Sequence, residues 1–191
     1  MIRILLLSLL VFFSASAFAV SIAGNPKGKI TLVEFMDYEC PHCRHMAPVI
    51  DELIQENHNL RVIYRVIPAF GAPSIFTDSA LLAAAQQPQK RFEVFNALLL
   101  AQTNDPTPDQ VVALAKKAKL NLPKLMHDMH NPSIRKTLGT NLSDFEALHN
   151  NHIPLIIIGR SGAKAASFMS IGEQPISKLQ TAINHMESSH D

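Results

Sequence analysis

The two cysteines of this 191-residue chain stand only two residues apart, in the motif Cys40-Pro41-His42-Cys43. A disulfide that closes so short a loop removes little conformational entropy from the unfolded chain, so it adds little stability. An exported chain that used a disulfide as a structural cross-link would usually close a longer loop with it. The spacing therefore favours a reactive cysteine pair over a structural one.

The motif lies between a predicted strand and a predicted helix. Residues 30–36 form a nearly continuous apolar run rich in β-branched side chains, which is typical of a buried central strand. Apolar side chains then recur at helical spacing over residues 46–54, and Pro41 is of a type favoured in the first helical turn. We therefore expect the motif at the N-terminus of a helix.

A helix start would make the two cysteines unequal. A thiolate, not a thiol, attacks a disulfide, so the site must stabilise negative charge on sulfur. Unpaired backbone N–H groups and the positive end of the helix dipole would lower the pKa of Cys40. His42 could add a hydrogen bond or a positive charge. Cys43, one turn into the helix, is expected to be the more shielded sulfur and to resolve a mixed disulfide.

The remaining elements follow a simple order. Residues 60–67 form a second strand candidate, and residues 74–149 show helical periodicity broken near prolines. Residues 153–159 form an apolar strand, a weaker strand at 165–171 pairs back on it, and an amphipathic helix begins near residue 176. The predicted order is β-α-β, a helical block, then β-β-α, and the block should pack against the strands.

The N-terminal residues have the layout of a secretory signal peptide. Arg3 precedes an apolar run at 4–13, and the small-residue site Ala17-Phe18-Ala19 follows. We expect cleavage after Ala19, and an uncleaved membrane anchor is the alternative. The formal net charge of +1 gives no broad attraction for nucleic acid or anionic lipid, so no nucleic-acid partner is expected.

A metal site is the structural alternative for the cysteine motif, because His42 and His45 lie close to it in the sequence. A structural zinc site needs four ligands, with further cysteines or a spaced histidine pair. The other histidines form no such pattern, and His127 and His130 are interpreted as a polar helix face. No metal site is therefore predicted.

These residues together resemble the DsbA family. The resemblance covers residues 33–43 with the Cys-Pro-His-Cys motif, the helical block, and Ile153-Pro154 at the start of a strand. DsbA-like proteins are bacterial periplasmic oxidases with a thioredoxin fold interrupted by a helical domain. The resemblance implies an α/β fold with a central mixed sheet flanked by helices. We expect a signal peptide at 1–19, a discontinuous thioredoxin-like domain at 20–73 and 150–191, and a helical insertion at 74–149.

The resemblance also implies roles for individual residues near the motif. Cys40 would be the nucleophile. Pro154 would be a cis-proline that faces the cysteines, and Ile153 would offer backbone hydrogen bonds to an extended client peptide. The alternative is an ordinary trans proline that starts a strand. His152 stands where such proteins commonly have glycine, so it could narrow or polarise the client groove and, with His42, make the redox behaviour depend on pH.

Glu34 lies six residues before Cys40 in an otherwise apolar strand. In DsbA-like proteins a buried acid at this spacing lies near the active site. Burial would raise its pKa and suit it to relay a proton to or from Cys43. The alternatives are a carboxylate on a solvated strand face or one paired with Arg65.

The expected function is that of an exported thiol-disulfide oxidoreductase that introduces disulfide bonds into periplasmic client proteins with free cysteines. The resemblance implies a DsbB-type, quinone-linked membrane partner that reoxidises it. No cofactor motif is present, so no cofactor is expected, and we expect a monomer. A disulfide isomerase or reductase on the same fold is one alternative. A metal-binding or peptide-binding module is the other.

Overall fold

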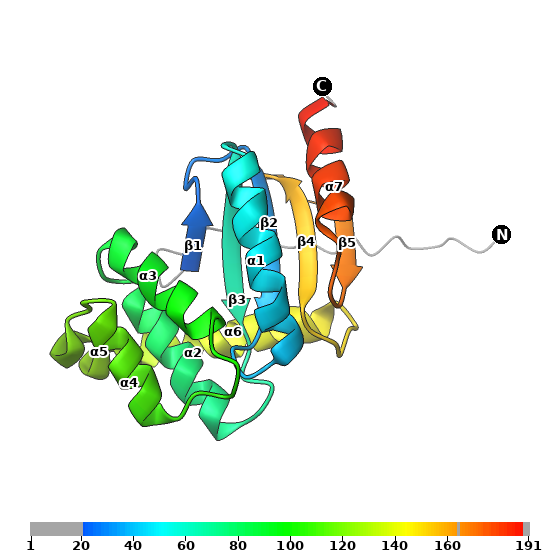
Figure 1. Cartoon of the computed structure of the whole chain (residues 1–191). Coiled ribbons are helices and arrows are strands. Elements are labelled where there is room, and N and C mark those ends of the chain that lie inside the picture. Colours follow the sequence, from blue (N-terminus) through cyan, green and yellow to red (C-terminus); the bar gives the residue numbers. More distant parts are fainter. Residues whose placement is uncertain (1–20, 164, 189–191) are drawn as a thin grey trace.

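The computed structural model describes residues 21–163 and 165–188, which form one mixed sheet flanked by helices (Figure 1). The strand order is β1-β3-β2-β4-β5. β2 and β3 are parallel, while β1 pairs antiparallel with β3, β4 with β2, and β5 with β4. The strands are β1 Ser21–Gly24, β2 Ile30–Met36, β3 Leu60–Val66, β4 Leu155–Arg160 and β5 Phe168–Ile171.

The central strand β2 is buried along its whole length because helices cover both faces of the sheet. Successive side chains of a strand point to opposite faces. Leu32 and Met36 belong to the larger apolar core, and Val33 and Phe35 belong to the smaller core on the other face. By the same alternation Glu34 faces the larger core, the side that α1 covers.

Two helices cover one face of the sheet and one covers the other. α1 (Pro41–Glu56) and α7 (Ile176–Ser188) pack against each other and against the strands of the larger core. α6 (Pro132–Ala147) covers the opposite face, where the rings of Phe35 and Phe145 lie 5.7 Å apart between centroids. The sheet is therefore the middle of three layers, as the expected fold class requires.

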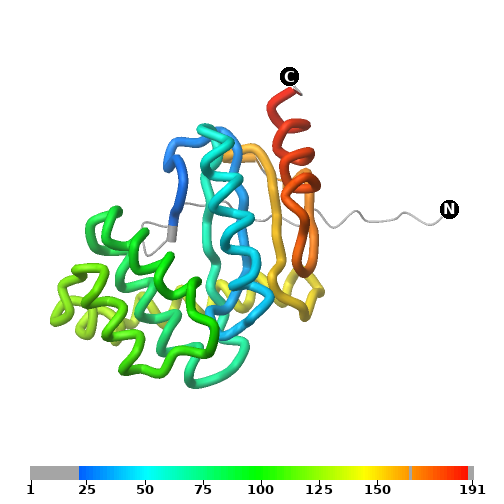
Figure 2. The backbone as a smooth tube through the Cα atoms, viewed as in Figure 1, coloured from blue at the N-terminus to red at the C-terminus, as the bar shows by residue number. Residues whose placement is uncertain are grey.

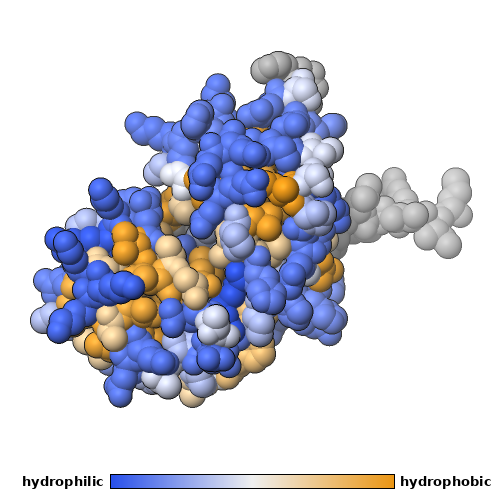
Figure 3. Space-filling view, viewed as in Figure 1, coloured by the Kyte–Doolittle hydropathy of each residue, from blue (hydrophilic) through white to orange (hydrophobic). Residues whose placement is uncertain are grey.

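Helices α2 to α6 lie between β3 and β4 in the chain and cover residues 72–147. Figure 2 shows the green helices of this block gathered beside the sheet. Phe92 and Phe95 of α3 share one buried cluster with Leu53 of α1, so the block packs against the strand-bearing part as expected. Some of its surface stays apolar (Figure 3). The helices not yet given are α2 Ala72–Ala84, α3 Gln89–Leu100, α4 Pro108–Lys117 and α5 Leu122–Met129.

The structure differs from the sequence interpretation at four strands. β3 ends at Val66 and not at residue 67. β1 was not predicted, and it forms an edge of the sheet beside β3. β5 covers residues 168–171 only, not 165–171. β4 begins at Leu155 and not at Ile153, since Pro154 has no N–H to donate to a strand ladder. The predicted signal peptide at 1–19 lies outside the described residues. Among the residues described, no helix is both long and apolar enough for a membrane span.

Candidate active site

The cysteine motif lies at the start of α1, just after the end of the central strand. Cys40 is the N-cap residue with extended backbone angles, and Pro41 is the exposed first residue of the helix. Asp37 organises the connecting loop, because its carboxylate accepts the N–H groups of Glu39 at 2.9 Å and Ala69 at 2.7 Å. The loop therefore fixes Cys40 where the first N–H groups of α1 are unpaired.

The surroundings of Cys40 stabilise its thiolate. Its pKa is lowered from 9.0 to about 6, first by a hydrogen bond from the Cys43 side chain and then by the backbone N–H groups of Cys43 and His42. The charge of His42 contributes least among the named causes, and burial of the sulfur opposes the shift. Cys40 is therefore largely ionised at neutral pH.

Cys43 behaves in the opposite way. It is 1% exposed, against 4% for Cys40, and the two cysteines are not bonded to each other. Burial raises the pKa of the Cys43 thiol far above its usual range, and its hydrogen bond to Cys40 adds to the shift. The structure thus combines a thiolate at the helix start with a shielded thiol that donates a hydrogen bond to it.

Glu34 is buried behind the motif and is not paired with Arg65. It is 1% exposed, and one of its carboxylate oxygens has no hydrogen-bond partner among the described residues. Its pKa is raised from 4.5 to about 8, first by burial and then by the charge of Cys40. Arg65 instead forms an ion pair with Asp144, with Nη2 of the arginine 2.6 Å from Oδ2 of the aspartate. Glu34 is therefore a protonated acid at neutral pH, close enough to influence both cysteines electrostatically.

Ile153 and Pro154 lie at the same end of the sheet as the motif. The Ile153–Pro154 peptide bond is cis, as the resemblance implied. In the antiparallel pairing of β4 with β2, Leu155 stands opposite Phe35, so Pro154 lies beside the end of β2 that leads to Cys40. Pro154 is buried and Ile153 is half-buried. The register of β4 on β2 therefore brings the cis peptide bond and the cysteine motif to the same end of the sheet.

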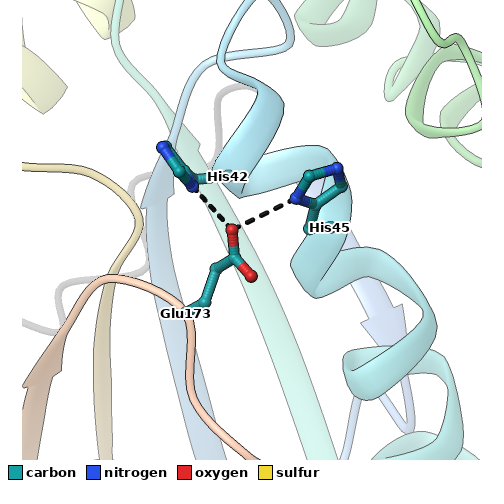
Figure 4. Close-up of side chains that lie close together, drawn as sticks. All are labelled: His42, His45 and Glu173. Atoms are coloured by element: carbon teal, nitrogen blue, oxygen red, sulfur yellow. Dashed lines mark hydrogen bonds and ion pairs between the residues drawn. The ribbon is translucent and has the colours of Figure 1, made fainter.

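His152 is exposed, and its carbonyl accepts a hydrogen bond of 2.8 Å from the Asn150 side chain. His42 is also exposed, but its ring is turned toward Glu173, with Nδ1 2.6 Å from Oε1 (Figure 4). This bond raises the pKa of His42 above its ordinary value. His42 thus supports Cys40 mainly through its backbone N–H, while its ring contacts Glu173.

Four acidic side chains near the motif, three of them buried and one exposed, were not singled out from the sequence. Asp37, Glu39 and Asp78 are buried, and burial raises the pKa of each. Glu39 accepts a hydrogen bond from the Thr77 hydroxyl at 3.0 Å, whereas both carboxylate oxygens of Asp78 have no partner among the described residues. Glu173, in contrast, is exposed. Acids directly before the motif were visible in the sequence, but Asp78 and Glu173 approach it only through the fold.

A cavity of about 470 Å³ lies away from the cysteines. It lies between the C-terminal half of α1, β1 and α3, where Asp51, Ile54 and Asn96 are among the lining residues. The motif occupies the other end of α1. The cysteine pair therefore does not line this cavity.

Comparisons with known proteins agree with this geometry. A family model described as thioredoxin matches residues 19–181. A thioredoxin-like oxidoreductase from Silicibacter pomeroyi is 27% identical with a TM-score of 0.80, over 90% of this chain and 94% of that one. A periplasmic thioredoxin-like protein from Salmonella enterica serovar Typhimurium is 22% identical with a TM-score of 0.76, over 90% and 91% of the two chains.

Two further comparisons show how far the likeness extends. The thiol-disulfide exchange protein alpha-DsbA2 from Wolbachia pipientis shares the fold at 18% identity, with a TM-score of 0.77 over 86% of this chain and 85% of that one. A curated relative, the Na(+)/H(+) antiporter NhaA 1 of Salinispora arenicola, is 29% identical over 101 residues, which is 53% of this chain. The chain spans only 16% of that antiporter's length.

The family match covers most of the chain, including the motif and the cis-proline. An ionised Cys40 beside a shielded Cys43 is suited to thiol-disulfide exchange, because the thiolate is the attacking species. This chain therefore belongs to the thioredoxin family, has its fold, and carries a pair of cysteines at the start of α1.

Proposed function

We propose that this protein is an exported dithiol oxidase that introduces disulfide bonds into client proteins in the periplasm. The observation that carries the proposal is the inequality of the two cysteines. The pKa of Cys40 is lowered to about 6, while that of Cys43 is raised by burial. A stable Cys40 thiolate favours the reduced form of the pair, so the oxidised form readily accepts electrons.

The reaction would begin with a Cys40–Cys43 disulfide. A client thiolate attacks Cys40 Sγ, the bond between the two cysteines breaks, and Cys43 leaves and takes up a proton. The second client thiolate then attacks the client sulfur of the mixed disulfide and expels Cys40 as a thiolate. The client loses two electrons and gains a disulfide, and the protein ends as the dithiol.

Glu34 is the proposed proton donor for Cys43. It lies on the α1 side of the sheet, its pKa is raised to about 8, and the negative charge left on it after ionisation would raise the pKa of Cys43. A protonated carboxyl group can therefore supply the proton that the leaving Cys43 sulfur needs. Pro41 would serve the second exchange indirectly, by starting the helix whose N–H groups stabilise the departing Cys40 thiolate.

The client would bind beside the cis-proline. We propose that the backbone of Ile153 bonds to an extended client segment and that Pro154 and His152 shape the groove around it. The exposure of His152 and the position of Pro154 at the same end of the sheet as the motif support this placement. The proposed reoxidant is a DsbB-type membrane partner, and the proposed working form is a monomer.

Export is proposed from the signal-peptide pattern of residues 1–19. The likeness to a periplasmic thioredoxin-like protein of Salmonella supports the same compartment. The periplasm also permits disulfides to persist, whereas the cytosol keeps most thiols reduced.

The reduction potential of the Cys40–Cys43 pair tests the oxidase proposal. The purified protein is equilibrated against glutathione buffers of graded ratio, and free thiols are trapped and counted. A disulfide donor should have a potential well above that of the glutathione pool, near the oxidising end of the thioredoxin-fold range. A potential well below it would make the protein a reductase, and a pair that does not cycle would remove redox exchange altogether.

A further inference from the structure

A cluster of ionisable side chains includes His42 of the cysteine motif but neither of the two sulfurs. Oε1 of Glu173 lies 2.6 Å from Nδ1 of His42 and 3.1 Å from Nδ1 of His45 (Figure 4). His42 and His45 are three residues apart on α1, so their side chains lie on the same face of the helix. Glu173 comes from the loop between β5 and α7, more than a hundred residues later.

The loop that carries Glu173 is fixed on both sides of that residue. The N–H of Gly172 donates to the carbonyl of Pro154 at 2.8 Å. The N–H of Gln174 contacts Sδ of the buried Met46 at 3.2 Å, and Met46 is itself part of α1. The position of the Glu173 backbone relative to the two histidines is therefore set by the fold, and only its exposed side chain is free to adjust.

Two imidazole nitrogens and one carboxylate oxygen form a donor set suited to zinc and neighbouring divalent transition metals. One such atom from each of the three residues lies within 4.8 Å of the other two. An ion about 2.1 Å from each donor needs donors roughly 3 to 3.4 Å apart. The side chains are 67%, 66% and 45% exposed, so small rotations suffice to reach that spacing.

We propose that His42, His45 and Glu173 bind one divalent transition-metal ion, with Zn²⁺ as the best-suited ion, and that water completes its coordination. The ion would take the place now occupied by the shared hydrogen bonds between the imidazoles and the carboxylate. Among the residues that the structure describes, no other group of three histidine, cysteine or acidic side chains converges in this way. The site goes beyond the oxidase proposal, because its ligands are not the cysteines.

The location of the site gives it a consequence for the dithiol. Two of its ligands project from the first turns of α1, the helix that begins at Cys40. A bound divalent cation would add positive charge at the end of α1 that carries Cys40. Protons compete with the ion, because both imidazoles must be neutral to bind it, so affinity should fall as the pH is lowered.

Calorimetric titration with Zn²⁺ tests the site in a protein that cannot bind metal through its thiols. The untagged protein carries Cys40→Ser and Cys43→Ser, and far-UV circular dichroism checks that it is folded. We expect one Zn²⁺ per chain. Adding His45→Ala or Glu173→Gln should weaken binding at least about tenfold, the scale on which metal sites respond to losing supporting groups.

His127→Ala is the matched control. His127 and His130 have the same spacing as His42 and His45 and are also exposed, but the acid between them, Asp128, pairs with Lys124. Zn²⁺ affinity should not change in this variant. Absence of saturable binding, or binding that His45→Ala and Glu173→Gln leave unaltered, would overturn the proposal and leave the cluster as an ion pair. Because the thiols are absent, neither outcome depends on whether the pair is an oxidase.

Discussion

Glu34 shows how a single buried side chain can serve the redox chemistry. Its carboxyl group is enclosed in the core on the α1 side of the sheet, and its pKa is raised to about 8 by burial first and by the charge of Cys40 second. Negative charge on Cys40 and a proton on Glu34 therefore favour each other. The favoured state at neutral pH is a Cys40 thiolate, a Cys43 thiol and a neutral Glu34.

This pKa shift predicts how stability depends on pH. Folded Glu34 keeps its proton up to about pH 8, whereas unfolded glutamate loses it near 4.5. The folded state thus binds more protons across this window, so the contribution of Glu34 to stability is full below about 4.5 and is lost as the pH rises toward 8. Glu34→Gln removes this loss. Across this pH window, the difference in free energy of unfolding between the variant and the wild type should therefore change by about a few kcal/mol, on the order expected for such a pKa shift.

The measurement is the free energy of unfolding in urea at several pH values across that window, with both proteins kept reduced. Glu52→Gln is the control, because Glu52 is an exposed acid of α1. Asp37, Glu39 and Asp78 also have raised pKa values and remain in both proteins, so only the difference between the curves reports Glu34. Parallel curves for wild type and Glu34→Gln would contradict the assignment.

At the scale of one element, the start of α1 separates two sources of thiolate stabilisation. The helix supplies backbone N–H groups from His42 and Cys43, while the Cys43 side chain supplies the largest single effect on the pKa of Cys40. Replacement of Cys43 can remove its side-chain hydrogen while leaving the backbone donors in place. The two sources can therefore be measured apart.

We predict that Cys43→Ala raises the pKa of Cys40 and that Cys43→Ser, whose hydroxyl can also donate, largely restores it. The ultraviolet absorbance of the Cys40 thiolate, followed during a pH titration, measures the pKa in each variant. His42→Ala should have the smaller effect, because its backbone donor remains and the charge of the ring contributes least among the named causes. A larger rise in His42→Ala than in Cys43→Ala would refute this ranking.

The same element shows what the sequence could and could not predict. The strand-to-helix start at Pro41 followed from periodicity and from proline's fixed backbone angle, and both are local properties. β1 was missed because four residues, one of them glycine, are too short for an alternating pattern. Glu173 was missed for another reason: it lies in a loop and meets His42 only through a contact across 131 positions.

Buried acids were harder to interpret than apolar runs. From the sequence alone, a carboxylate within an apolar strand could be buried or could lie on a solvated face. Glu34 is buried because α1 covers the face of the sheet to which its side chain points. Asp78 gave no signal at all, since a helix bearing one acid is expected to expose it. It is buried because α2 is packed against several other helices of the block as well as the core.

At the scale of the whole molecule, the helical block and the sheet share one continuous core. Phe92 and Leu81 from the block lie in the same buried cluster as Leu53 of α1 and Tyr64 of β3. The hydroxyl of Tyr38, in the loop before Cys40, also donates a hydrogen bond to Asn96 of α3. Unfolding of the block alone would expose apolar surface on the sheet side as well, at a cost of about 25 cal/mol per Å².

We therefore predict that the block and the sheet unfold together. Two probes can test this, because the chain has two tyrosines and no tryptophan. Tyr38 and Tyr64 are both buried in the shared core and report it by fluorescence, while far-UV circular dichroism reports mainly the helices. The two urea transitions should coincide, as in a two-state domain. Tyr38→Phe, which removes the bond to Asn96, should lower the midpoint of both transitions equally.

Separate transitions, with helical signal lost before the tyrosine signal, would mean that the block is a unit of lower stability. That result would also bear on the active site. Glu39, next to Cys40, accepts a hydrogen bond from Thr77 of α2, so opening of the block would release one support of the motif. Coincident transitions would instead mean that the loop before Cys40 is held by the global stability of the fold. The unequal cysteines could then persist for as long as the protein stays folded.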